Sequence, residues 1–445
     1  MPDPARLRIA LLSYRGNPFS GGQGVYVRHL SAAMRDLGHE VTVFSGQPYP
    51  DLVDGVPLVE VPSLDLYRAD DPFRTPRPRE FRDWIDGLEF AMLCTAAFPE
   101  PLTFSLRARR LLLAQRDRFD IVHDNHCLGW GVLGLHRAGV PVVASVHHAV
   151  VIDRDLELSR PMNLWRRTTL RRWYQFHTMQ DRVARRLPRV ITVSRQSRQD
   201  IVDTMKVDPA RIRVVPVAVD DAVFAPQPQV GRVPGRIFAV ASSDMALKGV
   251  VPLLRAVAEL RRRRAVELVI LGEAKPGGAV ARALRELRLG DAVRFVRGID
   301  DAGVARNYAE AQIAVVPSLY EGFSMPALQA MFCGTPLVAT TAGALPEVAG
   351  RDGETVLLVP PGNPPALAGA IGRLLDDDAL RSRLSAAARR RARERFSWAV
   401  TARATAAVYR EVLGIGPSPA DRLDGDHVGS AAAPLQVAPP STPVG

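Results

Sequence analysis

The chain has 445 residues, of which 47% are hydrophobic, enough for two α/β domains that each bury a core. Residues 1–12 hold no long apolar run and no later stretch reaches transmembrane length, so we expect no signal peptide, no membrane span and a cytoplasmic protein. The cysteines Cys94, Cys127 and Cys333 lack CxxC spacing, which argues against a disulfide framework or a structural zinc site and favours core packing.

The formal net charge of +11 favours an anionic partner such as a phosphorylated small molecule or a membrane surface. Much of it lies in residues 161–190, where one acid, Asp181, stands among Arg166, Arg167, Arg171, Arg172, Arg182, Arg185, Arg186 and Arg189. With Trp165 and Trp173 this pattern predicts a basic amphipathic helix, either a solvated face or one that lies peripherally on the anionic inner face of a membrane. No recognised module accompanies the charge, so we expect no nucleic-acid partner.

Short runs rich in β-branched residues recur along the chain, each followed by a helical pattern. They lie at 8–13, 40–45, 120–123, 141–147, 190–194 and 212–217 in the first half, and at 236–241, 266–271, 292–296, 313–317, 336–340 and 355–359 in the second. This alternation predicts βα units that build parallel sheets. Two sets of comparable size predict an α/β fold of two Rossmann-like domains, with a proline-punctuated boundary at 215–232.

The predicted organisation has four parts. A first domain spans 1–220, a second domain spans 221–395, a closing helix spans 396–413, and a tail rich in Pro, Ala, Ser and Gly at 414–445 is expected to be disordered. Residues 48–101 are rich in proline and charge and fit the βα alternation poorly, so we expect a long excursion there, and loops of that length are often functional.

A glycine cluster follows the first predicted strand and precedes a predicted helix. Gly22 and Gly24 flank Gln23 there, and glycines at a helix start let backbone N–H groups approach a phosphate or a sugar. The GxGxxG spacing of a dinucleotide site is absent, which disfavours a dehydrogenase.

The turn after the strand at 313–317 combines a carboxylate with a predicted helix start. Glu321 lies in the turn, Ser324 can cap a new helix, and Pro326 occupies its first turn. Helix N–H groups and one carboxylate then point at the same small volume. The N–H groups and the helix dipole suit a diphosphate, and Glu321 suits a sugar hydroxyl.

The sequence EGF at 321–323, followed by a helix and by CGTPLVAT at 333–340, resembles the donor-binding segment of retaining glycosyltransferases of family 4, which have the GT-B fold. The resemblance spans nearly the whole chain and includes Lys248-Gly249 and the segment 343–347. It implies two Rossmann-like parallel-sheet domains that face each other across a cleft. It also implies transfer from a nucleotide-sugar donor with retained configuration, by front-face attack and without a metal or another cofactor.

The same resemblance assigns roles to individual residues. Glu321, with Gly322, Phe323 and Ser324, would contact the donor, and Lys248 would neutralise the diphosphate. The family has a second glutamate where this chain has Gln329, which can still accept a hydrogen bond from a ribose hydroxyl but carries no charge. Ser242 and Ser243 stand where the family usually has an arginine. Arg297 would end a strand on the side where the family binds the nucleobase, and its position is equally typical of a surface residue.

In the first domain the candidate ligand-binding residues are histidines at the ends of predicted strands. His123 and His126 follow the strand at 120–123, and open α/β sheets bind ligands at such ends. The family has a histidine here that bonds the donor sugar, so either His123 or His126, together with Glu321 and Lys248, is a candidate catalytic residue.

These observations predict a hexosyltransferase whose base, sugar and acceptor the sequence leaves open, with a lipid or lipid-linked acceptor as the first guess. Two alternatives remain: a nucleotide-sugar epimerase or other GT-B enzyme, and a non-catalytic GT-B binding protein, the latter motivated by Gln329 and the missing arginine.

Overall fold

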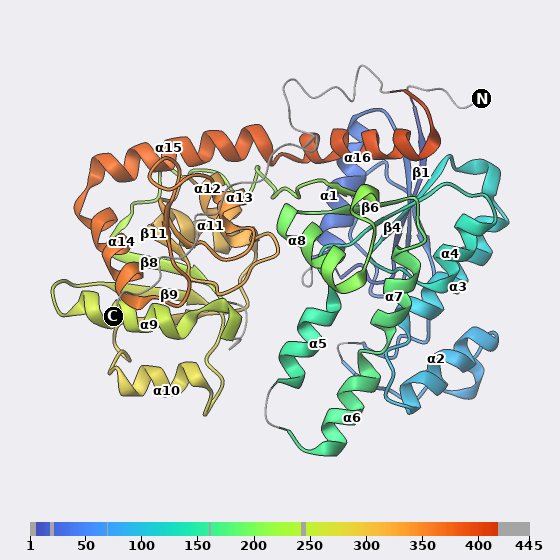
Figure 1. Cartoon of the computed structure of the whole chain (residues 1–445), viewed down its shortest axis with the longest axis horizontal. Helices are drawn as coiled ribbons and strands as arrows, with labels where there is room; N and C mark the ends of the chain where they lie inside the picture. Colours follow the sequence, from blue (N-terminus) through green and yellow to red (C-terminus); the bar gives the residue numbers. More distant parts are fainter. Residues whose placement is uncertain (1–5, 18–21, 69, 160–161, 242–245, 417–445) are drawn as a thin grey trace, which may run out of the picture.

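The computed structural model describes residues 6–17, 22–68, 70–159, 162–241 and 246–416. Figure 1 shows two α/β bodies side by side, joined along one edge by the last two helices. Ser242, Ser243 and the predicted tail from residue 417 onward lie outside the described residues. No helix in the described ranges combines the length and the hydropathy needed to cross a membrane.

The first body contains a seven-stranded parallel sheet in the order β3-β2-β1-β4-β5-β6-β7. Its strands are β1 (Arg8–Ser13), β2 (Glu40–Ser45), β3 (Leu58–Glu60), β4 (Ile121–Asn125), β5 (Val142–Ser145), β6 (Arg189–Thr192) and β7 (Ile212–Val214). The predicted runs all form strands, while β3, inside the irregular segment 48–101, was not predicted. Every residue of β4 and β5 is buried because helices cover both faces of the sheet.

Helices flank this first sheet. They are α1 (Gln23–Asp36), α2 (Trp84–Cys94), α3 (Glu100–Leu113), α4 (Trp130–Arg137), α5 (Val150–Leu158), α6 (Leu164–Trp173), α7 (Phe176–Ala184) and α8 (Arg195–Asp200), with the shorter η1 (Pro78–Glu80), η2 (Arg116–Arg118), η3 (Ile201–Met205) and η4 (Pro209–Arg211). The single basic helix predicted at 161–190 is wrong in its extent. It forms two helices, α6 and α7, of which only α7 contributes buried residues.

The second body contains a six-stranded parallel sheet in the order β10-β9-β8-β11-β12-β13. Its strands are β8 (Val233–Val240), β9 (Glu267–Leu271), β10 (Val293–Val296), β11 (Ala311–Val316), β12 (Leu337–Thr340) and β13 (Leu357–Val359). Its helices are η5 (Ala246–Lys248), α9 (Val250–Arg261), α10 (Ala279–Glu286), α11 (Asp301–Glu310), α12 (Met325–Phe332), α13 (Leu345–Ala349), α14 (Pro364–Asp376) and α15 (Asp378–Arg395).

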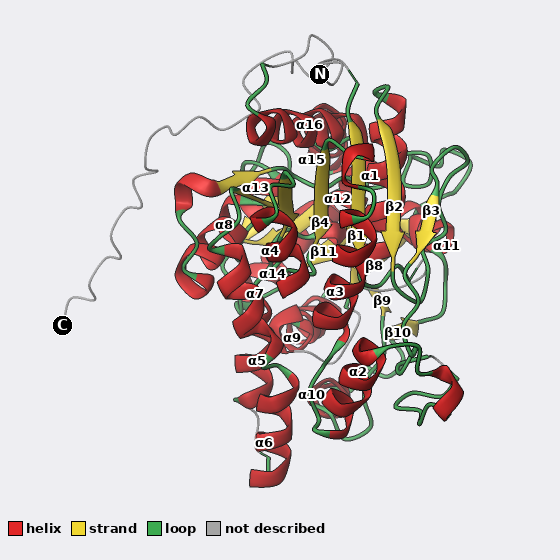
Figure 2. Ribbon diagram, turned by 90° about the vertical axis from the view of Figure 1, so that its right-hand side faces the viewer, coloured by secondary structure: helices red, strands yellow, loops and turns green. Residues whose placement is uncertain are grey.

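The closing helix α16 (Trp398–Leu413) returns to the first body. Figure 2 places it at the same end of the molecule as α15, close to α1. The Trp398 ring stacks on His29 of α1, with ring centroids 5.1 Å apart, and Glu411 forms ion pairs with Arg189 and Arg213. Since Tyr409 is buried in the same core as Ile9 and Leu11, α16 completes one face of the first sheet.

Candidate functional site

The carboxyl end of β11 places Glu321 beside Lys248. Glu321 is 8% exposed, and its Oε1 accepts hydrogen bonds from Lys248 Nζ at 2.9 Å and from Ser318 Oγ at 2.7 Å. Lys248 ends η5, which follows β8, so neighbouring strands of one sheet supply the pair. Because the charged bond is partly shielded from water, each group holds the other in place.

Close backbone packing fixes the turn that carries Glu321. Gly249 has a φ of +64°, and a Cβ there would lie 1.9 Å from the Pro317 carbonyl oxygen. A Cβ on Gly343 would lie 2.2 Å from the Glu321 carbonyl oxygen, which accepts the Ala344 N–H at 2.9 Å. Only glycine fits at both positions, so the glycines of the family resemblance bring the loops after β8, β11 and β12 together.

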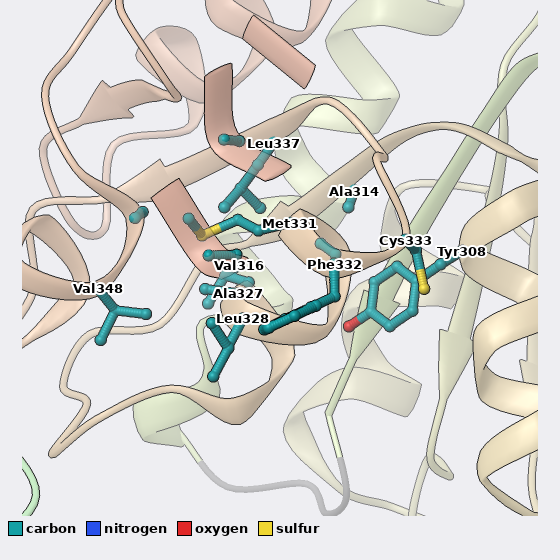
Figure 3. Close-up of a cluster of buried hydrophobic side chains, with 14 of the residues drawn as sticks. Tyr308, Ala314, Val316, Ala327, Leu328, Met331, Phe332, Cys333, Leu337 and Val348 are labelled. Atoms are coloured by element: carbon teal, nitrogen blue, oxygen red, sulfur yellow. The ribbon is translucent and has the colours of Figure 1, made fainter. Parts of the chain in front are cut away.

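Helix α12 starts directly after this turn. Ser324 caps it in the left-handed conformation, with its Oγ accepting the Ala327 N–H at 3.4 Å, and Phe323 packs edge-on against Phe396. Figure 3 shows the apolar face that anchors the helix against its strands, with Ala327, Leu328, Met331, Phe332, Ala314 and Val316 labelled. Anchoring on this face leaves the positive end of the helix beside Glu321, where an anion is stabilised. Gln329 is half-buried on the same helix.

His123 lies inside the first domain, where other side chains hold its ring. It is fully buried, with Nδ1 2.6 Å from the Tyr409 hydroxyl and Nε2 2.7 Å from Ser145 Oγ. Burial lowers its pKa to about 3, so the ring is neutral. Strand alternation turns His123 toward α16, on the face occupied by Leu11 and Val143. Both ring nitrogens thus bind the protein, and the catalytic role of His123 stays a prediction.

His126 lies at the carboxyl end of β4, as expected, in a left-handed conformation with a φ of +64°. Its Nδ1 accepts the His147 N–H at 3.0 Å, and the two rings lie nearly parallel at 5.7 Å. His126 is 3% exposed, and burial lowers its pKa well below the usual value. Of the two candidate histidines, His126 is the one that the strand presents at the sheet edge.

The carboxyl edges of the two sheets meet at Gly322. Its carbonyl oxygen accepts hydrogen bonds from Ser194 Oγ and, at 2.9 Å, from Ser197 Oγ, both next to β6 of the first body. Two further bonds cross the same boundary, Tyr320 to Asp200 and Arg195 to Glu347. The residue after Glu321 is thus held by the first body. Sequence reasoning missed these serines, whose only local signal is the capping of α8 by Ser194.

The remaining predicted donor residues occupy varied places. Gly22 is exposed at the start of α1, with a φ of +75°. Gly24 is buried, and a Cβ there would lie 2.3 Å from the Asn17 carbonyl oxygen, so backbone packing explains this glycine. Arg297 is exposed and paired with Glu273 at 3.1 Å. Ser242 and Ser243, the other predicted donor contacts, lie outside the described residues.

Two buried acids at the carboxyl edge of the first sheet were not predicted. Burial raises the pKa of Asp124 to about 7 and that of Glu100 to about 8. Perturbed carboxyl groups at a sheet edge are typical of ligand sites. Neither acid lies in a recognised motif, so the sequence does not predict that these two side chains are buried.

Comparison with known proteins identifies the family. Residues 20–223 match the family described as Glycosyltransferase Family 4, and residues 234–377 match Glycosyl transferases group 1. The MMP α-(1→4)-mannosyltransferase of Mycolicibacterium hassiacum is 51% identical over 408 residues, which cover 92% of this chain and 98% of that protein. The chain is a family 4 glycosyltransferase.

Other comparisons agree with this assignment. The D-inositol 3-phosphate glycosyltransferase of Kineococcus radiotolerans is 31% identical over 444 residues, covering 91% of this glycosyltransferase and 95% of that protein. The structure of a sucrose-phosphate synthase from Thermosynechococcus elongatus superposes with a TM-score of 0.67 at 24% identity, covering 92% and 100% of the two chains. The expected GT-B fold and the expected glycosyltransferase class are confirmed.

Proposed function

We propose that this glycosyltransferase moves a mannosyl residue from a nucleotide-diphosphate sugar to a sugar acceptor, forming an α-(1→4) linkage. The observation that carries the proposal is the 51% identity, over 98% of its length, to the Mycolicibacterium hassiacum mannosyltransferase. If the donor carries an α-linked mannose, an α-linked product means that the configuration is retained.

The Lys248–Glu321 pair supports this chemistry. In our proposal the diphosphate of the donor lies between Lys248 and the first turn of α12, where an amine and helix N–H groups stabilise the charge that develops as the sugar leaves. Glu321 accepts a hydrogen bond from a hydroxyl of the donor sugar, held in position by Ser318. Gln329 on α12 stands where the family has a glutamate, and its side-chain oxygen accepts a hydrogen bond from a ribose hydroxyl.

We further propose that transfer needs no divalent metal, since these residues already supply a cation and oriented N–H groups at the diphosphate. The acceptor attacks on the same face from which the diphosphate departs. Because Gly322 is bonded to Ser194 and Ser197 of the first domain, the donor turn is held against the domain that would carry the acceptor, an arrangement that excludes water.

A membrane-surface role for α6 also belongs to this proposal. None of its residues is buried, and Leu164 and Trp165 are 78% and 77% exposed beside several arginines. In both views α5 and α6 project away from the first sheet (Figures 1 and 2). Exposed tryptophan among arginines suits the anionic inner face of a membrane. Sedimentation with anionic vesicles, lost in Trp165→Ala, would support the role, and equal sedimentation of the variant would contradict it.

A donor screen tests the main proposal. Mannose and glucose donors carrying GDP, UDP or ADP are compared by calorimetry and by turnover onto an α-(1→4)-linked mannooligosaccharide, with and without magnesium. We expect one mannose donor to bind, to be used without metal, and to give an α-(1→4) product by NMR. Glu321→Ala should lose turnover, whereas the exposed control Glu354→Ala should not.

The alternatives predict different results from the same screen. Conversion of the donor without any acceptor would indicate an epimerase, and donor binding without turnover would indicate a non-catalytic protein. Transfer of glucose but not mannose would contradict the proposed substrate while leaving the family intact.

A further inference from the structure

Polar and aromatic side chains from the loop after β1, the first residue of α1, the segment between β3 and α3, and the first residue of α3 form a cluster at the carboxyl end of β1. We call it the Glu100 cluster, and its polar members are Tyr14, Arg15, Gln23, Tyr67 and Glu100. Gln23 donates to the Tyr14 hydroxyl at 3.3 Å, Arg15 Nε lies 3.4 Å from Glu100 Oε2, and Arg15 stands over the Tyr67 ring at 5.8 Å. The Phe98 ring joins these side chains into one connected group, because it contacts both Tyr14 and Tyr67, with ring centroids 6.4 and 5.5 Å away.

Three buried polar atoms of the cluster have no hydrogen-bond partner. They are Gln23 Oε1, the Tyr67 hydroxyl and Glu100 Oε2. Glu100 is 8% exposed, and its approach to Arg15 does not form a hydrogen bond. Buried polar atoms are nearly always satisfied in a working protein. Several unsatisfied atoms in one connected group point to a ligand that carries hydroxyl groups.

Aromatic rings surround these polar atoms. Tyr67 contacts Phe73, Phe98 and Trp173, with ring centroids 5.5, 5.5 and 5.7 Å away. Phe73 is 61% exposed and has a φ of +65°, a conformation that is costly for a bulky residue. Strained backbone of this kind concentrates at ligand sites. An exposed ring beside polar groups is a surface on which the apolar face of a pyranose can stack.

The cluster faces the donor-binding domain. β1 and β6 are parallel strands of one sheet, so their carboxyl ends lie along the same edge, separated by β4 and β5. That edge meets Gly322, next to Glu321, through Ser194 and Ser197. At a strand spacing of about 4.8 Å, the cluster lies roughly 14 Å along the edge from this contact.

Glu100 is uncharged at neutral pH. Burial raises its pKa to about 8, outweighing the opposing Arg15, while the nearby Glu89 and Asp65 raise it further. The phenols of Tyr14 and Tyr67 also have raised pKa values, so they stay protonated. A protonated carboxyl both donates and accepts hydrogen bonds, as adjacent sugar hydroxyls require.

We propose that the Glu100 cluster is the acceptor-recognition site, in which Phe73 stacks on a sugar ring of a neutral oligosaccharide while Glu100, Tyr67 and Gln23 bind its hydroxyls. This inference rests on the proposed function, because it names the acceptor of that reaction. Arg15 is the cluster's one cation, and the groups with unsatisfied atoms, Glu100, Tyr67 and Gln23, are uncharged at neutral pH, so these groups suit the hydroxyls of an uncharged glycan.

The test compares acceptor and donor parameters in wild type, Phe73→Ala, Glu100→Gln and the control Trp84→Ala. Trp84 is 66% exposed on α2 of the same segment. Loss of one stacking contact should raise the acceptor KM about twofold to tenfold in Phe73→Ala, with the donor KM unchanged. The wild-type acceptor KM should rise above about pH 8, where Glu100 ionises, and Glu100→Gln should abolish that rise.

Binding of the mannooligosaccharide is also measured by calorimetry with GDP, UDP or ADP present in turn, so that it does not depend on turnover. Weaker binding in Phe73→Ala but not in Trp84→Ala supports the site even if wild type transfers no mannose. Unchanged acceptor binding and an unchanged pH profile in both cluster variants overturn it. Binding of a phosphorylated or lipid-linked sugar but not of the neutral oligosaccharide also overturns it, while leaving the glycosyltransferase assignment standing.

Discussion

Replacing His123 by leucine should destabilise the first domain without disturbing the donor site. His123→Leu keeps an apolar side chain of similar size in the core but removes both bonds that the ring makes, to Tyr409 and to Ser145. Tyr409 and Ser145 are each 1% exposed. A buried group left without a partner costs about 1–3 kcal/mol. The Tyr409 hydroxyl is left without a partner, whereas Ser145 keeps its hydrogen bond with Tyr26 and loses one bond worth about 1 kcal/mol. We therefore expect a total loss of about 2–4 kcal/mol.

Urea unfolding followed by circular dichroism measures this loss, and calorimetry measures donor affinity on the same samples. Tyr409→Phe is the matched control, since it deletes one hydroxyl and keeps the ring. Because the two residues share a bond, the double variant should lose less than the sum of the single losses. If His123→Leu unfolded at the same urea concentration as wild type but no longer bound the donor, the structural role would be refuted and His123 would be a ligand-binding residue.

The same variant should change the response to acid. The pKa of His123 is lowered to about 3 in the folded protein, so below its ordinary value near 6.5 the unfolded chain binds a proton that the folded chain does not. Stability from this group is complete above pH 6.5 and is lost as the pH falls toward 3, by about 1.4 kcal/mol per pH unit. His123→Leu should therefore lose less stability than wild type over that range.

Lys248→Ala should lower kcat by about 10²–10³ in steady-state assays, because the leaving diphosphate loses its cation; a loss under threefold would contradict that role. Gly249→Ala should lower Tm more than Gly353→Ala does, since both residues have positive φ but only at Gly249 does a Cβ strike a backbone oxygen, that of Pro317. Burial favours the protonated form of Glu100 in the folded protein, so wild type should lose stability as the pH rises from about 4.5 through 8. Glu100→Gln cannot ionise and should abolish that loss. Thermal unfolding at pH 5 and pH 8.5 checks this, and parallel curves would contradict it.

The strands were predictable because their buried, β-branched runs are local signals. All the predicted runs form strands of parallel sheets. β3 was missed because it is three residues long, lies at the sheet edge and follows Pro57 in a proline-rich segment. The break between α6 and α7, near Tyr174, carries no glycine or proline, so the arginine pattern alone predicted one helix.

The donor turn was predictable for the same reason. Glu321, Gly322 and Ser324 lie in one short segment, and the sequence resemblance added Lys248, which the structure brings within hydrogen-bond distance of Glu321. Residues whose role depends on distant partners were not predictable. The partner of His123 is Tyr409, 286 positions later, and the partner of Ser197 is Gly322 in the other domain.

The position of α16 has a consequence for synthesis on the ribosome. The core of the first domain includes Ala402 and Tyr409 from this last helix, so the domain made first cannot close its core until the end of the chain has emerged. The second domain, from β8 to α15, is contiguous in sequence and can complete its own core earlier. The order of folding during translation should thus run against the order of synthesis, with one apolar face of the first sheet awaiting α16.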